Sequence, residues 1–348
     1  MNLIDYLNTY KDISFKENRF NEVDAMILSL MSYFPFDGLG KSKITSDTMI
    51  EYLQIYQSPI QSERKLSDIV VLKILCSCKR YKDIKFLDFV KKTSGEAIEQ
   101  FQAVTIDLGD FCFVSFCGTD ATIIGWREDF NMAFLDIVPS EVDAIQYINM
   151  QRKKHPFKKM YIGGHSKGGR LAIRAGKELE KKDNLLAIFS FDGPNFTDSF
   201  YDYSYEEMKH LIYEYAPNES IVGRLINDHP KIIVSSTAKG IMQHNCYSWE
   251  VVEDHLVHKE EYTSKSNKIA KITKEAFTGF DLETKSIFVN TLFDIIKDVD
   301  LGKVNDDVMV FAKSSLKNVK IEWKNTPKEK RKVLLKVLLT TIMIAVKR

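Results

Sequence analysis

The stretch from Tyr161 to Gly169 places a serine between glycines. It contains Ser166 in the pattern Gly-x-Ser-x-Gly, with an apolar segment before it and a helical segment beginning near Arg170. A serine on a sharp turn between strand and helix exposes its hydroxyl, and flanking glycines let the two elements approach closely. The helix N-terminus also directs backbone N–H groups toward developing negative charge. This context predicts a nucleophilic serine, and the spacing fits neither of the common phosphate-binding glycine patterns.

A nucleophilic serine needs a base to take its proton and a carboxylate to orient that base. Behind such a turn the order along the chain is serine, acid, histidine. His244 follows an expected strand at 231–236 by a short loop, where a base at the sheet edge would lie. We therefore predict His244 as the base. The other histidines after the serine precede a strand or a proline or lie in a charged stretch; they are His210, His229, His255 and His258.

Three carboxylates compete for the role of the acid. Glu219 is the only carboxylate in the loop 216–223, after an expected strand, and is our first candidate. Asp228 lies further along and is the alternative acid. Asp192 follows an earlier strand, but there it could simply cap the turn before a proline.

Two backbone N–H groups are expected to form the oxyanion hole, about 3 Å from the tetrahedral oxygen. One is the amide of Lys167, directly after the serine. The second should come from a loop after an earlier strand, and Thr119 ends such a strand.

The elements around these residues predict an α/β protein. Two β-rich segments, 103–108 and 111–116, flank Gly109-Asp110, which is typical of a hairpin turn. After them, strands alternate with helices of ten or more residues, a pattern that favours a mainly parallel sheet covered on both faces. The expected strands are 159–162, 186–191, 211–215 and 231–236, and the expected helices are 141–152 and 170–182.

The ends of the chain read as helical. Apolar spacing predicts helices over 20–31 and 69–78, and the pattern is helical again from residue 269. We therefore divide the chain into an N-terminal helical part packed on the core (1–95), a core with the serine turn (96–258) and a basic helical extension (259–348).

Composition excludes several protein classes. The 348 residues carry 49 Lys and Arg against 48 Asp and Glu, and 44% are hydrophobic, which is unlike a disordered or low-complexity chain. No uninterrupted run of 18 apolar residues and no secretory signal pattern occurs. Five cysteines are odd in number and too sparse for a disulfide framework, which favours free thiols and a cytoplasmic location. Motifs for a metal, a cofactor or nucleic acid are lacking.

The charge is uneven along the chain. Residues 301–348 hold 12 Lys and Arg against 4 Asp and Glu, a local charge of +8. Within them a basic cluster precedes the apolar run 333–346, whose 14 residues span about 21 Å as a helix, short of a ~30 Å hydrocarbon core. The segment 328–348 can lie on an anionic membrane surface or pack against the protein, and the sequence leaves both open.

The motifs together resemble known families. The segments 114–119, 125–130 and 164–169 are similar to the A-F-R-G-T/S, N-W-x-x-D and G-H-S-L-G-G stretches of class 3 (fungal-type) triacylglycerol lipases. A closer resemblance is to an uncharacterised bacterial family of lipase-like α/β hydrolases, whose pattern includes G-G-H-S-K-G-G, F-D-G-P and S-I-V-G. The resemblance covers roughly residues 20–252, with Cys117 standing where that family has arginine.

The resemblance implies an α/β-hydrolase fold with added N- and C-terminal helices. It also implies a serine hydrolase that cleaves small-molecule or lipid carboxylic esters through an acyl-enzyme on Ser166, with His244 and Thr119 in the roles given above. Two departures matter. In the lipases the acid normally stands directly before an I/V-V-P-x-L segment, whereas here Ser220 stands at that position. Cys117 also lacks the charged, bidentate guanidinium of the arginine that it replaces. The alternative hypothesis is therefore a catalytically impaired binding or interaction protein that keeps the fold.

Overall fold

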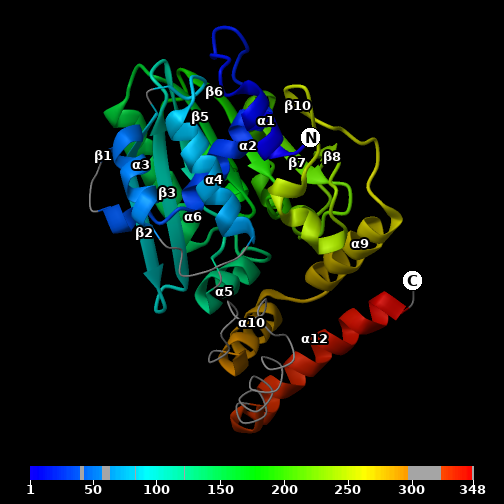
Figure 1. Ribbon diagram of the computed structural model, residues 1–348. Helices are drawn as coiled ribbons and strands as arrows, with labels where there is room; N and C mark the ends of the chain where they lie inside the picture. The colour runs from blue at the N-terminus through cyan, green and yellow to red at the C-terminus, as the bar shows by residue number, and fades with distance from the viewer. Residues whose placement is uncertain (40–42, 57–62, 83, 121, 297–322, 347–348) are drawn as a thin grey trace.

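One mixed sheet forms the centre of the protein. The computed structural model describes residues 1–39, 43–56, 63–82, 84–120, 122–296 and 323–346. Within them eight strands lie side by side in sequence order (Figure 1). They are β1 (Lys43–Thr45), β2 (Lys85–Ser94), β3 (Glu99–Asp107), β4 (Phe111–Phe116), β5 (Lys159–His165), β6 (Leu185–Phe191), β7 (Ile212–Pro217) and β8 (Ile232–Val234).

The sheet changes character at β4. The strands β1 to β4 are antiparallel to their neighbours, and β4 to β8 run parallel. The expected hairpin is present, with Gly109 at φ 81° in its turn. The five parallel strands with helical crossovers confirm the expected α/β-hydrolase fold, because the strand–serine–helix turn follows the central strand β5. The range 1–95, expected to be helical, also contributes β1 and β2.

Helices occupy both faces of this sheet and the C-terminal part of the chain (Figure 1). They are α1 (Leu3–Tyr10), α2 (Glu22–Leu30), α3 (Ser46–Ile55), α4 (Glu63–Ser77), α5 (Ile123–Asn131), α6 (Pro139–Lys154), α7 (Lys167–Lys177), α8 (Tyr203–Met208), α9 (Ser264–Thr278), α10 (Leu282–Ile296) and α12 (Lys328–Val346). A two-stranded hairpin joins β9 (Val251–Val252) to β10 (His255–Leu256). The helices expected over 20–31, 69–78, 141–152 and 170–182 are therefore present as α2, α4, α6 and α7.

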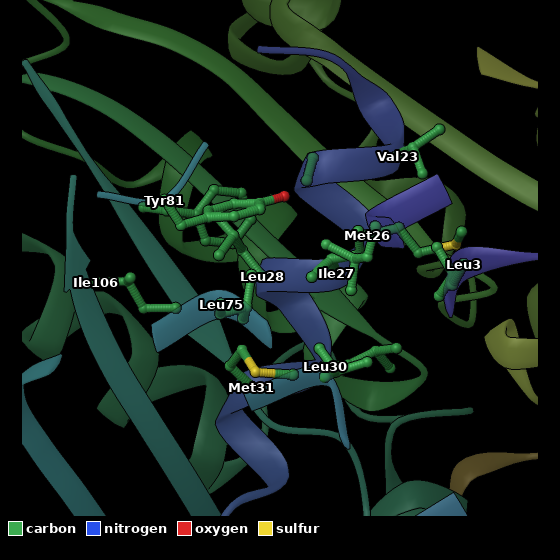
Figure 2. Packing of buried hydrophobic residues seen from close by; sticks show 14 of the residues in the cluster. Leu3, Val23, Met26, Ile27, Leu28, Leu30, Met31, Leu75, Tyr81 and Ile106 are labelled. Carbon is green, nitrogen blue, oxygen red and sulfur yellow. The ribbon is translucent and has the colours of Figure 1, made fainter. Parts of the chain in front are cut away.

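The N-terminal helices build the core on one face of the sheet. Helix α2 is buried along its length from Val23 to Leu30, so its apolar residues contact both the sheet and its helical neighbours. Figure 2 shows Leu3 of α1 and Leu75 of α4 packed around this helix. On the other face α6 and α7 cover the sheet around a second apolar cluster, which includes Ile162 of β5. The serine turn at the end of β5 is thus held between two cores.

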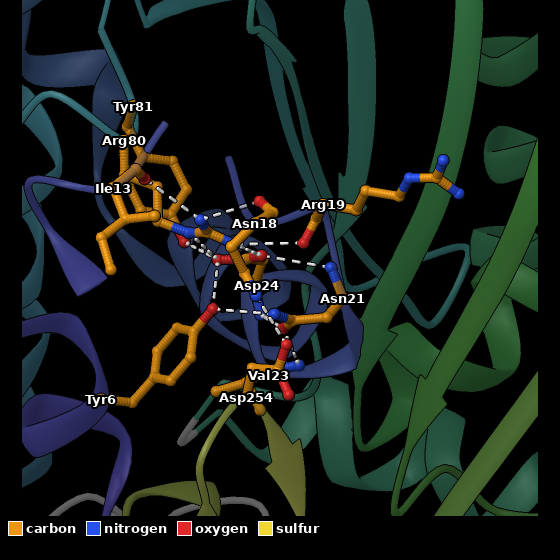
Figure 3. A network of polar contacts seen from close by, with 10 residues as sticks. All are labelled: Tyr6, Ile13, Asn18, Arg19, Asn21, Val23, Asp24, Arg80, Tyr81 and Asp254. Carbon is orange, nitrogen blue, oxygen red and sulfur yellow. Dashed lines mark hydrogen bonds and ion pairs between the residues drawn. The ribbon is translucent and has the colours of Figure 1, made fainter. Parts of the chain in front are cut away.

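A buried ion pair anchors α2 (Figure 3). Asp24 and Arg80 are both fully buried, and the guanidinium donates to the two carboxylate oxygens over 2.9 Å and 2.5 Å. The hydroxyls of Tyr6 and Tyr81 also donate to Asp24. A buried charge is tolerated only when it is paired and hydrogen-bonded, as here. The network fixes α2, which packs on β5, against the segment after α4.

Helix α10 packs beside α5, away from the centre of the sheet (Figure 1). Arg127 of α5 donates to Asn290 of α10 over 2.7 Å, and the rings of Phe130 and Phe293 lie 5.4 Å apart. Helix α12 packs on α9 and α10, with Leu334 buried. Over the described ranges no helix is both long and apolar enough to cross a bilayer.

Candidate active site

Ser166 lies at a sharp turn between β5 and α7. Its backbone adopts φ 59° and ψ −134°, in the left-handed half of the map that L-residues rarely occupy. The amide of Ser166 donates to the carbonyl of Phe191 at the end of β6 over 2.9 Å. Non-glycine residues held at positive φ store strain and cluster at functional sites. The side chain is half-buried, so the turn presents the hydroxyl at the carboxyl edge of the sheet.

The glycines around Ser166 are required by close backbone approach. A Cβ on Gly164 would lie 2.2 Å from the carbonyl carbon of Gly168, and a Cβ on Gly168 would lie 2.1 Å from the carbonyl oxygen of Phe116. Both distances are far below van der Waals contact with backbone atoms that cannot move aside. The Gly-x-Ser-x-Gly spacing therefore has a steric cause in this fold.

His244 is oriented by Asp192. His244 is the last residue of a short 3₁₀ helix, η6 (Gly240–His244), and its Nδ1 donates to Oδ2 of Asp192 over 2.6 Å. Asp192 directly follows β6 and is only 1% exposed, whereas the His244 side chain is 24% exposed. An imidazole held at Nδ1 by a buried carboxylate keeps Nε2 available as a base.

The other oxygen of Asp192 is also held. Its Oδ1 accepts from the hydroxyl of Ser220 over 2.6 Å and from the amide of Gly223 over 3.1 Å. A Cβ on Gly223 would lie 2.3 Å from this oxygen, so the contact needs glycine. The Ser-Ile-Val-Gly segment at 220–223 thus binds the carboxylate, and both oxygens are fixed.

The structure corrects the position expected for the carboxylate beside His244. Glu219 does not occupy it: its carboxylate accepts from the amide of Gly240, and its own amide donates to the Gln243 side chain over 2.9 Å. These bonds hold the loop that carries His244 without touching the imidazole. Asp228 pairs instead with Arg224 over 2.7 Å at the surface.

A second histidine links the serine turn to this loop. His165, next to Ser166, donates from Nε2 to the carbonyl of His244 over 2.7 Å. Because a carbonyl can only accept, Nε2 carries the proton, and Nδ1 lies 2.9 Å from the hydroxyl of Tyr33. The rings of His165 and His244 are 4.5 Å apart between centroids. The loop is thereby held beside the residue that precedes Ser166, a contact that sequence reasoning missed.

The two expected oxyanion donors both lie at the carboxyl edge of the sheet. Lys167 is the first residue of α7, so its N–H is one of those without a partner inside the helix. Thr119 lies beyond β4, and its hydroxyl donates to Oδ2 of Asp129 on α5 over 2.5 Å. This bond occupies the threonine hydroxyl and leaves its backbone N–H as the group that could bind an oxyanion.

The sequence matches one known protein family. The family profile described as Mbeg1-like matches residues 75–294. The chain belongs to the Mbeg1-like family. None of the curated proteins that were compared matches it.

Solved lipases resemble this Mbeg1-like protein at low identity. A fungal lipase in an inhibitor complex is 15% identical, over 68% of this chain and 80% of its own, with a TM-score of 0.41. Lipase II from Rhizopus niveus is 17% identical, over 66% and 93%, with a TM-score of 0.37. The lipase of Rhizomucor miehei, solved as a propeptide complex, is 18% identical over 47% and 59%, with a TM-score of 0.34. The match therefore spans less than two thirds of that last lipase.

Metal chemistry has no evident ligand set in the part of the Mbeg1-like chain that the structure describes. No group of three or more His, Cys, Asp or Glu side chains there is arranged to hold an ion. The five cysteines, all within the described residues, form no disulfide. Burial raises the pKa of Cys112 to about 11, so this thiol is a poor nucleophile at neutral pH.

Asp129 makes the Thr119 contact sensitive to pH. Burial, with a smaller contribution from Glu128, raises the pKa of Asp129 to about 6 against the opposing effects of Lys167, the Thr119 hydroxyl and His244. Its Oδ1 is buried without a hydrogen-bond partner. A raised carboxyl pKa means that the folded state binds the proton more tightly. The protonated carboxyl therefore makes its full contribution to the free energy of unfolding below about pH 4. That contribution is lost as pH rises through about 6.

We expect Asp129→Asn to stabilise the protein near pH 8, because the neutral amide avoids the cost of a buried carboxylate. Since the pKa of Asp129 is about 6, the wild-type carboxyl is mostly protonated at pH 5, and the difference in unfolding free energy should shrink there. Urea unfolding of both proteins at pH 5 and 8 measures this. A difference that stays constant across this range would contradict it.

Proposed function

We propose that this Mbeg1-like protein is a serine hydrolase that cleaves carboxylic esters through an acyl-enzyme on Ser166. The observation that carries the proposal is the 2.6 Å bond between Asp192 and His244, whose carbonyl accepts from His165, the residue before Ser166 at positive φ. A serine, an imidazole and a buried carboxylate in this chain order are the groups needed for nucleophilic acyl transfer.

The reaction would proceed in two halves. The Ser166 oxygen attacks the ester carbonyl carbon while His244 Nε2 takes the hydroxyl proton, and Asp192 stabilises the imidazolium. The N–H groups of Lys167 and Thr119 receive the oxyanion. The imidazolium then gives its proton to the departing alcohol oxygen, leaving an acyl-enzyme. Water, activated by the same imidazole, releases the acid and restores the serine.

The surroundings favour an ester with an apolar part. Ile241 and Met242, on the same short helix as His244, are 53% and 65% exposed, and Trp126 of α5 is 45% exposed. Large apolar side chains kept in solvent beside a polar site are typical of surfaces that bind apolar ligands. We propose a small-molecule or lipid ester as substrate.

A fluorophosphonate probe tests the proposal directly. The probe phosphonylates a serine activated by a neighbouring base, so wild type should be labelled and Ser166→Ala should not. Ser199→Ala removes another serine hydroxyl at an exposed position and serves as the matched control, with labelling expected as in wild type. An unlabelled wild type that is folded by circular dichroism would support the non-catalytic alternative. Equal labelling of Ser166→Ala would refute the assignment of the nucleophile.

We further propose a cytoplasmic location with peripheral contact to an anionic membrane through 328–348. Four lysines of α12 are exposed in the structure: Lys328, Lys330, Lys332 and Lys336. Lysines at an anionic surface each contribute about 1 kcal/mol of attraction at moderate salt. Such contact would bring the site to a lipid ester.

Co-sedimentation with phosphatidylglycerol vesicles tests the membrane contact. Wild type should bind at low salt and dissociate as salt rises, whereas changing the four α12 lysines to Gln should weaken binding by about tenfold or more. A fourfold Gln variant at Lys153, Lys154, Lys181 and Lys182, which are exposed elsewhere, is the matched control. Equal loss in both variants, or binding to neutral phosphatidylcholine vesicles alone, would contradict a specific role of α12.

A further inference from the structure

Lys167 sends its side chain back into the protein. The side chain is 1% exposed, and its ammonium donates to the carbonyl of Gln100, to the Gln100 side-chain oxygen and to Glu128, over 2.7, 2.6 and 3.1 Å. An ammonium has three N–H groups, and here each has an acceptor. Lys167, whose backbone N–H is the proposed oxyanion donor, is thus held in place through its side-chain ammonium.

Glu128 completes this contact from α5. It is fully buried; one oxygen also accepts from the amide of Gln100 over 3.0 Å, and the other accepts from the amide of Ser140 over 2.9 Å. A buried ion pair contributes little net stability compared with apolar residues of the same volume. Stability therefore does not account for two charges at this position, whereas fixed geometry does.

The same helix holds the second oxyanion residue. Asp129, next to Glu128, accepts from the Thr119 hydroxyl over 2.5 Å. One turn earlier, a Cβ on Gly125 would lie 2.9 Å from Cγ2 of Thr119 and 3.3 Å from the side-chain oxygen of Gln100. Helix α5 is therefore in close contact with the Thr119 turn and with the glutamine that binds Lys167.

We propose that the buried Lys167–Glu128 pair is a positioning device that sets the Lys167 N–H relative to the Thr119 N–H through helix α5. Both N–H groups must point at one oxygen, and a misplacement of about 1 Å costs roughly 100-fold in rate. The inference rests on the proposed hydrolase function, because it assigns the pair to the oxyanion hole of that reaction. The side chains of Lys167 and Glu128 are positioning groups and do not touch substrate.

A double-mutant cycle tests this role. We expect Lys167→Leu and Glu128→Leu each to unfold at lower denaturant and to hydrolyse a p-nitrophenyl ester with kcat lowered about 10- to 100-fold, while KM changes little. The double variant should unfold at higher denaturant than either single variant, because no buried charge is left unpaired, although the amides of Gln100 and Ser140 still lose their acceptor. Its kcat should stay low. Lys177→Leu is the matched control: Lys177 is a buried lysine on the same helix, paired with Asp202 over 2.9 Å, and its variant should keep kcat within about twofold. Recovery of kcat with stability in the double variant would overturn the proposal.

Amide hydrogen exchange gives a readout that needs no catalysis. Either single variant should speed exchange both in the peptide that contains Thr119 and in the peptide that contains Lys167, relative to the Lys177→Leu control. Faster exchange at only one of the two, or the same change as in the control, would overturn the coupling. A wild type without esterase activity or probe labelling would refute the proposed hydrolase, whereas the exchange result would still decide whether α5 couples the two segments.

Discussion

Replacing Asp192 by Asn is expected to lower kcat for ester hydrolysis by about 10⁴-fold while the protein stays folded. An asparagine at this position keeps an oxygen for Ser220 and Gly223, so the loop retains its bonds. Its NH₂ group, however, would face Nδ1 of His244, where the carboxylate now accepts over 2.6 Å. The imidazole would then carry its proton on Nε2 and could not accept the serine proton. Steady-state kinetics with a short p-nitrophenyl ester and a urea unfolding curve measure both parts of this expectation.

Glu219→Gln is the matched control for that experiment. Glu219 lies in the loop where sequence order favours the acid, but its carboxylate accepts from the amide of Gly240. Glutamine can accept the same bond, so we expect kcat to fall by less than about tenfold. Similar losses in the Asp192 and Glu219 variants would show that His244 is oriented differently in solution. A loss of less than tenfold in Asp192→Asn would remove the main support for the proposed function.

The local signals of the sequence were sufficient for much of the fold. The serine turn, the parallel strands and their crossover helices follow from apolar runs and turn residues that act over ten or fewer positions. The antiparallel strands β1 and β2 were missed for a physical reason. β1 spans only Lys43–Thr45, and β2 carries two lysines on its exposed half and a break in register between Leu87 and Val90, so neither shows a clean alternation. β2 depends on pairing with β3, and β1 depends on pairing with β2, which is tertiary information.

The carboxylate beside His244 could not be separated from its rivals by spacing. Asp192 and His244 are 52 positions apart and meet only because β6 ends beside the serine turn. A weak signal existed: Asp192 ends a buried strand directly before Gly193-Pro194. The same pattern caps ordinary turns, and here Asp192 has φ 50°, which aspartate tolerates better than most residues. The buried Lys167–Glu128 pair was likewise hidden, because a lysine at a helix start normally lies in solvent.

Gly164→Ala is expected to destabilise the protein by about 5 kcal/mol, enough to unfold many domains. The added Cβ would lie 2.2 Å from the carbonyl carbon and 2.3 Å from the carbonyl oxygen of Gly168, and neither backbone atom can rotate away. Relief requires α7 to move from β5, which shifts Ser166 and the Lys167 N–H together. Any folded fraction should therefore react with the fluorophosphonate probe at least about 100-fold more slowly.

Gly95→Ala is the matched control, because its Cβ would meet only Ile124 Cδ1 at 3.8 Å, an ordinary contact, and the substitution should change stability by less than about 1 kcal/mol. Denaturant unfolding and the rate of probe labelling, measured on both variants, decide the matter: a Gly164→Ala protein as stable and as reactive as Gly95→Ala would mean that the turn is wider than described and that its glycines serve no steric purpose.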